Sequence, residues 1–185
     1  MKNNAGKKDT SWGGVAGWYD ELLEASSDSF QSKVIMPNLI RILDPKPGMT
    51  VADVACGQGY FSRAFAANGA DVAACDISPE LIKLAQSKPL GAPTSKGPVI
   101  KAGKLTFAVA PADDLAWMAD ASAGAMTIIL ALQNIENLAG TMAEASRVLK
   151  PHGRLIFVIN HPAYRIPKSS SWVWDEKSST QYRRV

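Results

Sequence analysis

The sequence predicts an α/β protein with a doubly wound, mainly parallel sheet. Short β-branched, apolar runs alternate along the chain with segments whose apolar residues recur at helical spacing. Such alternation is typical of βαβ units, in which helices cover both faces of a parallel sheet. The length of 185 residues and the hydrophobic share of 46% suit one globular domain with a substantial core.

The first two strands are predicted on either side of a helix. Residues 50–55 (TVADVA) form a short apolar run, and residues 71–76 (DVAACD) form the next. Between them, residues 61–68 (FSRAFAAN) place apolar side chains on one helical face, and Gly69 suits the end of that helix. Ligands of such sheets bind beyond the carboxyl ends of the strands, so we expect a site in the loops that follow.

The remaining helices and strands of the prediction follow from local signals. Ser78-Pro79-Glu80 is typical of a helix N-terminus, with a capping hydroxyl, a first-turn proline and a first-turn acid. Upstream of the sheet, a helical pattern contains Pro37, which kinks the helix or starts its second half. The remaining elements are strands over 105–110, 125–132 and 154–159, a helix over 138–149 and a turn at 151–153.

The loop after the first strand has two glycines and follows an acid. Asp53 is followed by Gly57 and Gly59, but the third glycine of the dinucleotide fingerprint G-x-G-x-x-G is missing from this loop. A carboxylate at Asp53 would repel a diphosphate but attract an ammonium group. The helix N-terminus after Gly59 favours an anion. A ligand with a cationic amine, a carboxylate and a ribose accounts for these features, and S-adenosylmethionine has those groups.

Several motifs, taken in order, resemble those of class I S-adenosylmethionine-dependent methyltransferases of the small-molecule type. VADVACGQGYFS is similar to the family's first motif, and Asp76 matches the acid that hydrogen-bonds both ribose hydroxyls. APADDL (110–115) resembles the third-strand motif G-D-A-E-x-L, and EASRVLKPHGRLIFVI resembles the stretch through the fifth strand. The resemblance implies a Rossmann-like fold and S-adenosyl-L-methionine as the cofactor.

The resemblance also implies a set of cofactor-binding residues. Ile77 falls where a family residue packs on the adenine. Asp113 is the candidate for the adenine amino group, because Pro111 occupies the position of the other acid. Two alternatives stay open: an acid at Asp76 alone would also suit NAD, and Asp53 could instead hydrogen-bond the glycine loop. The full set is Asp53, Ala55, Cys56, Gly57, Gly59, Asp76, Ile77, Ala112, Asp113 and Leu130.

Three regions divide the chain. Residues 1–45 are predicted to form an N-terminal helical segment or lid, residues 46–160 the cofactor-binding core, and residues 161–185 a shortened acceptor-side tail. We expect the sheet to lack the last two of the family's seven strands, because the tail is short and polar. The chain is then interpreted as a fragment or a naturally shortened form. The aromatic residues around Tyr19 either close over the cofactor or dock on the sheet.

Candidate residues for the chemistry lie after the fourth and fifth strands. His161 is the candidate base, since histidine titrates near neutrality, although His-Pro is also an ordinary turn after a strand. Asn134 and Glu136 lie where family members line the acceptor site, and both could equally be loop groups or caps; Tyr19 is another substrate candidate. The segment LQNIEN differs from the N-P-P-Y type, which argues against planar amide or base nitrogens as acceptors. Cys56 is interpreted as a packed residue rather than a nucleophile.

The predicted function is transfer of a methyl group from S-adenosylmethionine to a small-molecule acceptor by direct displacement. Two alternatives stay open, a cofactor-binding or interaction module without activity and an NAD-dependent oxidoreductase. The net charge of +3 does not indicate a nucleic acid partner, and neither a membrane span nor a signal peptide is predicted. The two cysteines suggest reduced thiols in a cytoplasmic protein. No spacing resembles a metal site, and the oligomeric state stays open.

Overall fold

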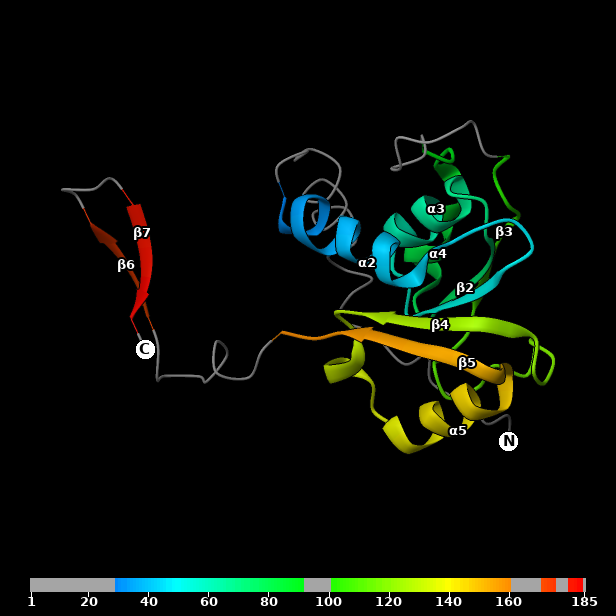
Figure 1. Ribbon diagram of the computed structural model, residues 1–185. Helices are drawn as coiled ribbons and strands as arrows, with labels where there is room; N and C mark the ends of the chain where they lie inside the picture. Colours follow the sequence, from blue (N-terminus) through cyan, green and yellow to red (C-terminus); the bar gives the residue numbers. More distant parts are fainter. Residues whose placement is uncertain (1–28, 92–100, 161–170, 176–179, 185) are drawn as a thin grey trace.

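A five-stranded parallel sheet forms the centre of the molecule (Figure 1). The structure is a computed structural model that describes residues 29–91, 101–160, 171–175 and 180–184. The strand order is β3-β2-β1-β4-β5, and every neighbouring pair is parallel, which confirms the predicted doubly wound α/β fold. The strands are β1 Thr50–Val54, β2 Asp71–Asp76, β3 Leu105–Val109, β4 Ala123–Ile129 and β5 Leu149–Val158.

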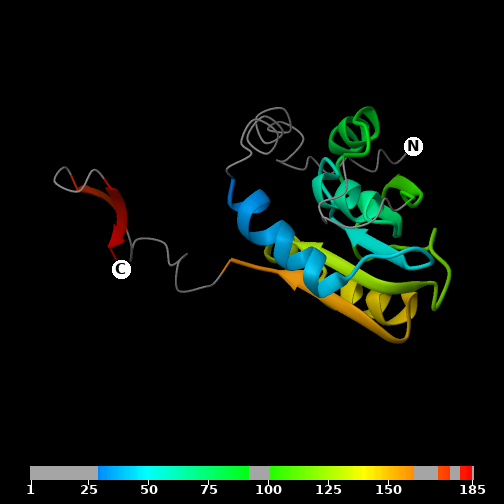
Figure 2. The ribbon, with the colours of Figure 1, turned by 45° about the horizontal axis from the view of Figure 1, so that its top comes forward.

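Helices cover both faces of this sheet. Figures 1 and 2 show α2, α3 and α4 on one face and α5 on the other. Side chains of the central strand β1 pack on both faces of the sheet. Val51 packs with residues of α2 and α3, whereas Val54 packs with residues of α5. None of the helices that the structure describes is long and apolar enough to cross a bilayer. The helices are α2 Met36–Leu43, α3 Tyr60–Ala67, α4 Pro79–Ser87 and α5 Leu138–Val148.

The predicted helical segment before the sheet forms in two parts. A π-helix over Gln31–Ile35 leads into α2, and Pro37 lies in the first turn of α2. Proline suits this position because the N–H that it lacks would have no helical partner there. Arg154 of β5 donates hydrogen bonds to the carbonyls of Ile42 and Leu43, both at 2.7 Å, and so holds the end of α2 against β5.

Strand β4 is shorter at its carboxyl end than the sequence predicts. It ends at Ile129, whereas the apolar run 125–132 predicted a strand through residue 132. Leu130 has a left-handed backbone with φ of 55°, which takes the chain out of the extended conformation. A 3-10 helix over Leu132–Asn134 follows.

Strand β5 is longer than predicted because the expected turn at 151–153 lies inside it. The strand begins at Leu149, and its pairing with β4 shifts register between Ala123 and Ala125. His152 has a positive φ of 64° at this irregularity. An irregularity of this kind accommodates extra residues in one strand while the pairing continues on both sides.

The C-terminal tail forms two strands that the sequence analysis did not predict. β6 (Ser171–Asp175) and β7 (Thr180–Arg184) pair antiparallel with each other. They form a two-stranded sheet of their own and do not join the main sheet. Within the described residues the main sheet has five strands, which does not contradict the expectation that the last two of the family are missing from it.

Replacing Ser78 with alanine is expected to lower the free energy of unfolding by about 1 kcal/mol. The Ser78 hydroxyl accepts a hydrogen bond from the Leu81 N–H at 3.3 Å and caps α4, as the sequence predicted. Denaturant unfolding measures the loss. Ser87→Ala is the matched control, because the Ser87 hydroxyl donates to the Leu84 carbonyl at the other, exposed end of the helix. An equal loss in the two variants would contradict the capping role.

Candidate functional site

The loop after β1 turns at the two predicted glycines. Gly57 and Gly59 have φ values of 59° and 74°, in the left-handed region that glycine adopts without a steric penalty. A Cβ at Gly59 would lie 2.8 Å from the Phe107 ring and 3.2 Å from the Ala85 Cβ, so the loop packs closely there. A Cβ at Gly57 would meet no atom within 4 Å. The loop therefore has one packed side and one open side just before the N-terminus of α3.

Asp53 is a buried acid inside β1, only 2% exposed. Its carboxylate oxygens accept hydrogen bonds from the Ser62 hydroxyl at 2.5 Å and from the Thr127 hydroxyl at 2.7 Å. Burial raises the pKa of Asp53 from the ordinary 3.8 to about 6, against the opposing effect of these two hydrogen bonds. A buried carboxylate of this kind is a group whose charged form a nearby cation would stabilise.

Asp76 ends β2 and contacts the glycine loop directly. One of its carboxylate oxygens accepts the Gly57 N–H at 2.8 Å, and the other accepts the Ser78 N–H at 2.9 Å. Burial raises the pKa of Asp76, and the backbone hydrogen bonds oppose that shift. The charge of Asp76 in turn raises the pKa of Asp53. The structure thus brings both predicted acids together at the carboxyl ends of two neighbouring strands.

Three more predicted residues lie where β1 and β4 end. Ala55 and Leu130 both have positive φ, 56° and 55°, which is uncommon outside glycine and gathers at functional sites. The Cys56 N–H donates to the Cys75 carbonyl at 2.9 Å and joins the loop to β2. Burial raises the pKa of the Cys56 thiol well above its ordinary value, which supports its interpretation as a packed residue and not a nucleophile.

The loop after β3 lies beside Asp76. Its first residue, Ala110, donates its N–H to the Asp76 carbonyl at 3.0 Å. Ile77, the residue after Asp76, is 42% exposed. An apolar side chain that is exposed next to a buried acid is available to pack against a flat ring. The placement is consistent with the adenine contact that the resemblance implies for Ile77.

The other predicted residues of this loop are partly engaged by α5. Asp113 accepts a hydrogen bond from the side-chain amide of Asn137, the N-cap residue of α5, at 2.7 Å. Ala112 precedes it and is half-buried. The expected role of Asp113 at an adenine amino group therefore has to coexist with this bond to α5.

The predicted acceptor-side residues are only partly described. Asn134 ends the 3-10 helix after β4 and is exposed, and its N–H donates to the Ala131 carbonyl at 2.8 Å. Tyr19 and His161 lie outside the residues that the structure describes. Their roles stay predictions.

Sequence reasoning missed the two hydroxyl partners of Asp53. Ser62 lies on α3 and Thr127 on β4, so the acid joins three elements of the fold. Ser62 ends the stretch that resembles the family's first motif, but nothing in that stretch shows that its hydroxyl bonds Asp53, and threonine in a strand carries no motif signal. A buried acid does require hydrogen-bond donors, and that requirement is the signal that could have prompted a search for them.

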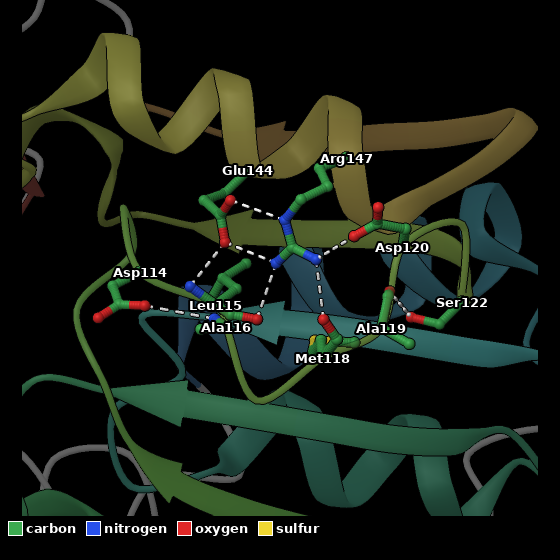
Figure 3. A network of polar contacts seen from close by, with 9 residues as sticks. All are labelled: Asp114, Leu115, Ala116, Met118, Ala119, Asp120, Ser122, Glu144 and Arg147. Atoms are coloured by element: carbon green, nitrogen blue, oxygen red, sulfur yellow. Dashed lines mark hydrogen bonds and ion pairs between the residues drawn. The ribbon is translucent and has the colours of Figure 1, made fainter.

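Sequence reasoning also missed a polar network between α5 and the loop after β3 (Figure 3). Arg147 of α5 pairs with Glu144 and Asp120, both at 2.7 Å, and donates to two carbonyls of the loop. The hydrogen bonds from Arg147 lower the pKa of Glu144 to about 2. Both residues belong to a segment whose likeness to the family was clear from the sequence, but no local pattern shows what Arg147 contacts.

The fold and the site have the features of a Rossmann-like protein. A parallel sheet in the order β3-β2-β1-β4-β5, with a glycine loop after β1 and an acid at the end of β2, is shared by class I S-adenosylmethionine-dependent methyltransferases and by dinucleotide-binding proteins, and the sequence family decides between these two classes. Residues 52–157 match the family model of the methyltransferase domain, and the chain belongs to this family. The cofactor that the family implies is S-adenosylmethionine.

Known proteins resemble the chain in sequence and in structure. The chain is 30% identical over 123 residues to the demethylmenaquinone methyltransferase of Tropheryma whipplei, a match that covers 66% of this chain and 46% of that protein. It is 32% identical over 109 residues to the ubiquinone biosynthesis O-methyltransferase of Xanthomonas campestris pv. campestris, covering 59% and 42%. The chain thus spans about half the length of the curated relatives that it matches.

A solved structure shows the same fold. The S-adenosylmethionine-dependent methyltransferase from Mesorhizobium loti superposes with a TM-score of 0.60 at 23% identity. The superposition covers 85% of this chain and 65% of that chain. At this identity the likeness establishes the shared fold and leaves the acceptor undefined.

Proposed function

We propose that the chain binds S-adenosylmethionine across the carboxyl ends of β1 and β2 and transfers its methyl group to a small-molecule acceptor. The observation that carries the proposal is the arrangement of two buried acids around the glycine loop. Asp53 is buried in β1, four residues before Gly57, and has a raised pKa, and Asp76 is hydrogen-bonded to Gly57. A cofactor with a cationic amine and ribose hydroxyls is chemically complementary to this pair.

The residues at the strand ends fit the parts of this cofactor. Asp76 has lone pairs left to accept hydrogen bonds from the ribose hydroxyls. Ile77 is exposed and would cover one face of the adenine. The N–H groups that follow Gly59 at the start of α3 would hold the carboxylate. Asp53 would stabilise the amine by its charge while Ser62 and Thr127 keep it oriented.

The cofactor, when bound, supplies a methyl group on a positively charged sulfur, which is already activated for displacement. The chain's own contribution is to align donor and acceptor and to exclude water. Asn134 is exposed after β4 and is proposed to contact the acceptor, together with Tyr19. His161 is proposed to take the proton of an acceptor that must lose one.

The acceptor that we propose is a small aromatic molecule of the quinol type. Two curated relatives, at 30% and 32% identity, are named for the methylation of demethylmenaquinone and for ubiquinone biosynthesis. A phenolic hydroxyl needs to lose its proton before it attacks a methyl group, and that need matches the base role proposed for His161.

A cofactor-binding module without activity is the second candidate function. It is favoured by β5, which is an edge strand of the main sheet within the residues that the structure describes. Exposed strand edges pair readily with other chains, so this edge suits an interaction role.

Calorimetric titration of the purified chain with S-adenosylmethionine, S-adenosylhomocysteine and NAD tests the cofactor. We expect the first two to bind with dissociation constants of roughly 1 μM to 1 mM, the usual range for enzyme ligands, and NAD not to bind. Binding of NAD alone would support an oxidoreductase instead. A folded chain that binds none of the three would overturn the proposal.

Transfer of a labelled methyl group to a panel of small quinols and catechols tests the acceptor. Product formation would support the enzyme. Cofactor binding without transfer to any member of the panel would favour the module without activity. If the wild type transfers the methyl group and His161→Ala transfers it at the same rate, His161 is not the base.

A further inference from the structure

Three polar side chains of α5 contact the loop after β3. They lie on one side of the helix, because Glu144 follows the N-cap residue Asn137 by about two turns and Arg147 follows Glu144 by about one turn. We call these three residues the α5 clamp. The loop that they contact, residues 110–118, has neither helix nor strand to define its shape. It also carries Asp113, the candidate that the resemblance gives for the adenine amino group.

Arg147 makes most of the hydrogen bonds between the α5 clamp and the loop, together with Glu144 (Figure 3). Its guanidinium donates to the carbonyls of Leu115 and Met118, both at 2.9 Å, and to the Asp120 carboxylate at 2.7 Å. Glu144 accepts two more of its N–H groups, at 2.8 and 2.7 Å, and also accepts the Leu115 N–H at 2.7 Å. The five bonds use every N–H of the guanidinium. The backbone of the loop is thereby held at two points by charged groups.

Asn137 extends the clamp to the carboxylate of Asp113. Its Nδ2 donates to the Asp113 Oδ2 at 2.7 Å, while its Oδ1 accepts the Gly140 N–H at 3.0 Å. Gly140 leaves the room for this bridge, since a Cβ there would lie 2.5 Å from the Asn137 Nδ2 and 3.0 Å from the Asp113 Cβ. Glycine is a poor helix former, so the space for the bridge is a physical reason for glycine inside α5.

We infer that the α5 clamp makes the site selective for adenine, and that its three members are positioning residues that act through the loop. The inference rests on the proposed function. The Ala110 N–H bond to the Asp76 carbonyl places the loop beside the acid proposed to hold the ribose. A carboxylate recognises an amino group only when the loop holds it in position, because hydrogen bonds weaken steeply with misalignment. Asp113 has lone pairs for an adenine amino group as well as for Asn137.

A comparison of two nucleosides separates this role from a merely structural one. S-adenosylhomocysteine and S-inosylhomocysteine share the ribose and the amino acid, and differ in that inosine has a carbonyl where adenine has its amino group. A general loss of stability weakens both ligands alike and leaves their affinity ratio unchanged. A displaced loop lowers the ratio, because only adenine loses its partner.

The variants Gly140→Ala and Arg147→Met test the inference by calorimetry with both nucleosides. We expect the wild type to prefer S-adenosylhomocysteine by about ten- to a hundredfold, the range that one or two unmatched hydrogen-bonding groups produce. Gly140→Ala pushes the Asn137 amide off Asp113 while it improves helix propensity, and Arg147→Met releases the loop backbone. Both are expected to bring the ratio down at least threefold, which is the lower end of what the loss of one hydrogen bond produces.

Arg154→Met is the matched control, because Arg154 also donates to two backbone carbonyls but joins β5 to α2. Its ratio is expected to equal that of the wild type. If Arg147→Met fails to fold, the ratio measured for Gly140→Ala tests the inference by itself. An unchanged ratio in the folded clamp variants, or a wild type that binds both nucleosides equally, would overturn the inference and leave the proposed function standing. A wild type that binds neither would overturn both.

Discussion

Asp53→Asn is expected to raise the free energy of unfolding at pH 7 by up to about 3 kcal/mol, because it removes a buried charge. Asp53 is 2% exposed, and its pKa is raised from 3.8 to about 6, chiefly by burial. An asparagine has nearly the same shape and can still bond the Ser62 and Thr127 hydroxyls, which rotate to donate or accept. The gain is an upper value, since the charged hydrogen bonds of the wild type are stronger than neutral ones.

The pH dependence of stability identifies the source of this gain. Between the unfolded pKa of 3.8 and the folded value of about 6, the folded chain keeps a proton on Asp53 that the unfolded chain has released. The contribution of Asp53 to stability is therefore present at low pH and is lost as the pH rises through this window. Denaturant unfolding should show the variant and the wild type close to each other near pH 4 and furthest apart at pH 7. A difference that does not vary with pH would contradict this account.

The same substitution is expected to weaken S-adenosylmethionine binding at pH 7, because the amide carries no charge to stabilise the cofactor's amine. The wild-type affinity should itself fall as the pH is lowered through about 6, where Asp53 takes up its proton. Calorimetry at pH 5 and pH 7.5 measures both effects. The wild type should approach the affinity of Asp53→Asn at the lower pH. A wild-type affinity equal at both values would remove Asp53 from the cofactor site.

Asp76→Ala is expected to lower the affinity for S-adenosylmethionine by about a hundredfold or more, since hydrogen bonds to a charged group each contribute about 1.5–3 kcal/mol. The variant loses the proposed ribose acceptor. It also leaves the N–H groups of Gly57 and Ser78 without the carboxylate that accepts them at 2.8 and 2.9 Å. Stability should fall by about 1–3 kcal/mol for each of these groups that finds no other partner.

Asp71→Ala is the matched control for Asp76→Ala. Asp71 lies at the other end of β2, and its side chain also accepts a backbone N–H, that of Lys104 at 2.8 Å. We expect calorimetry to show wild-type cofactor affinity in this variant even where its stability is reduced. Comparable affinity in Asp76→Ala and Asp71→Ala would place the cofactor elsewhere.

Much of the fold follows from short-range patterns in the sequence. The run 71–76 and residues 50–54 of the run 50–55 are strands because β-branched, apolar residues gather between turn residues. Ser78 caps a helix because its hydroxyl can reach a neighbouring N–H. Predicted boundaries were wrong where backbone conformation depends on distant contacts. Leu130 ends β4 in a left-handed conformation while its N–H bonds to Val158, and no residue next to Leu130 indicates this.

The order of strands and helices, the glycine loop and the two acids are properties of neighbouring residues, so the amino-acid sequence specified the class of the protein and its cofactor. The surroundings of those acids depend on the folded chain. Thr127 lies 74 residues from the Asp53 that it holds, and Arg147 lies 32 residues from the Leu115 carbonyl that it clamps. Such partners meet only when the parallel sheet brings its strand ends and flanking helices together, because hydrogen bonds act over about 3 Å whatever the separation along the chain.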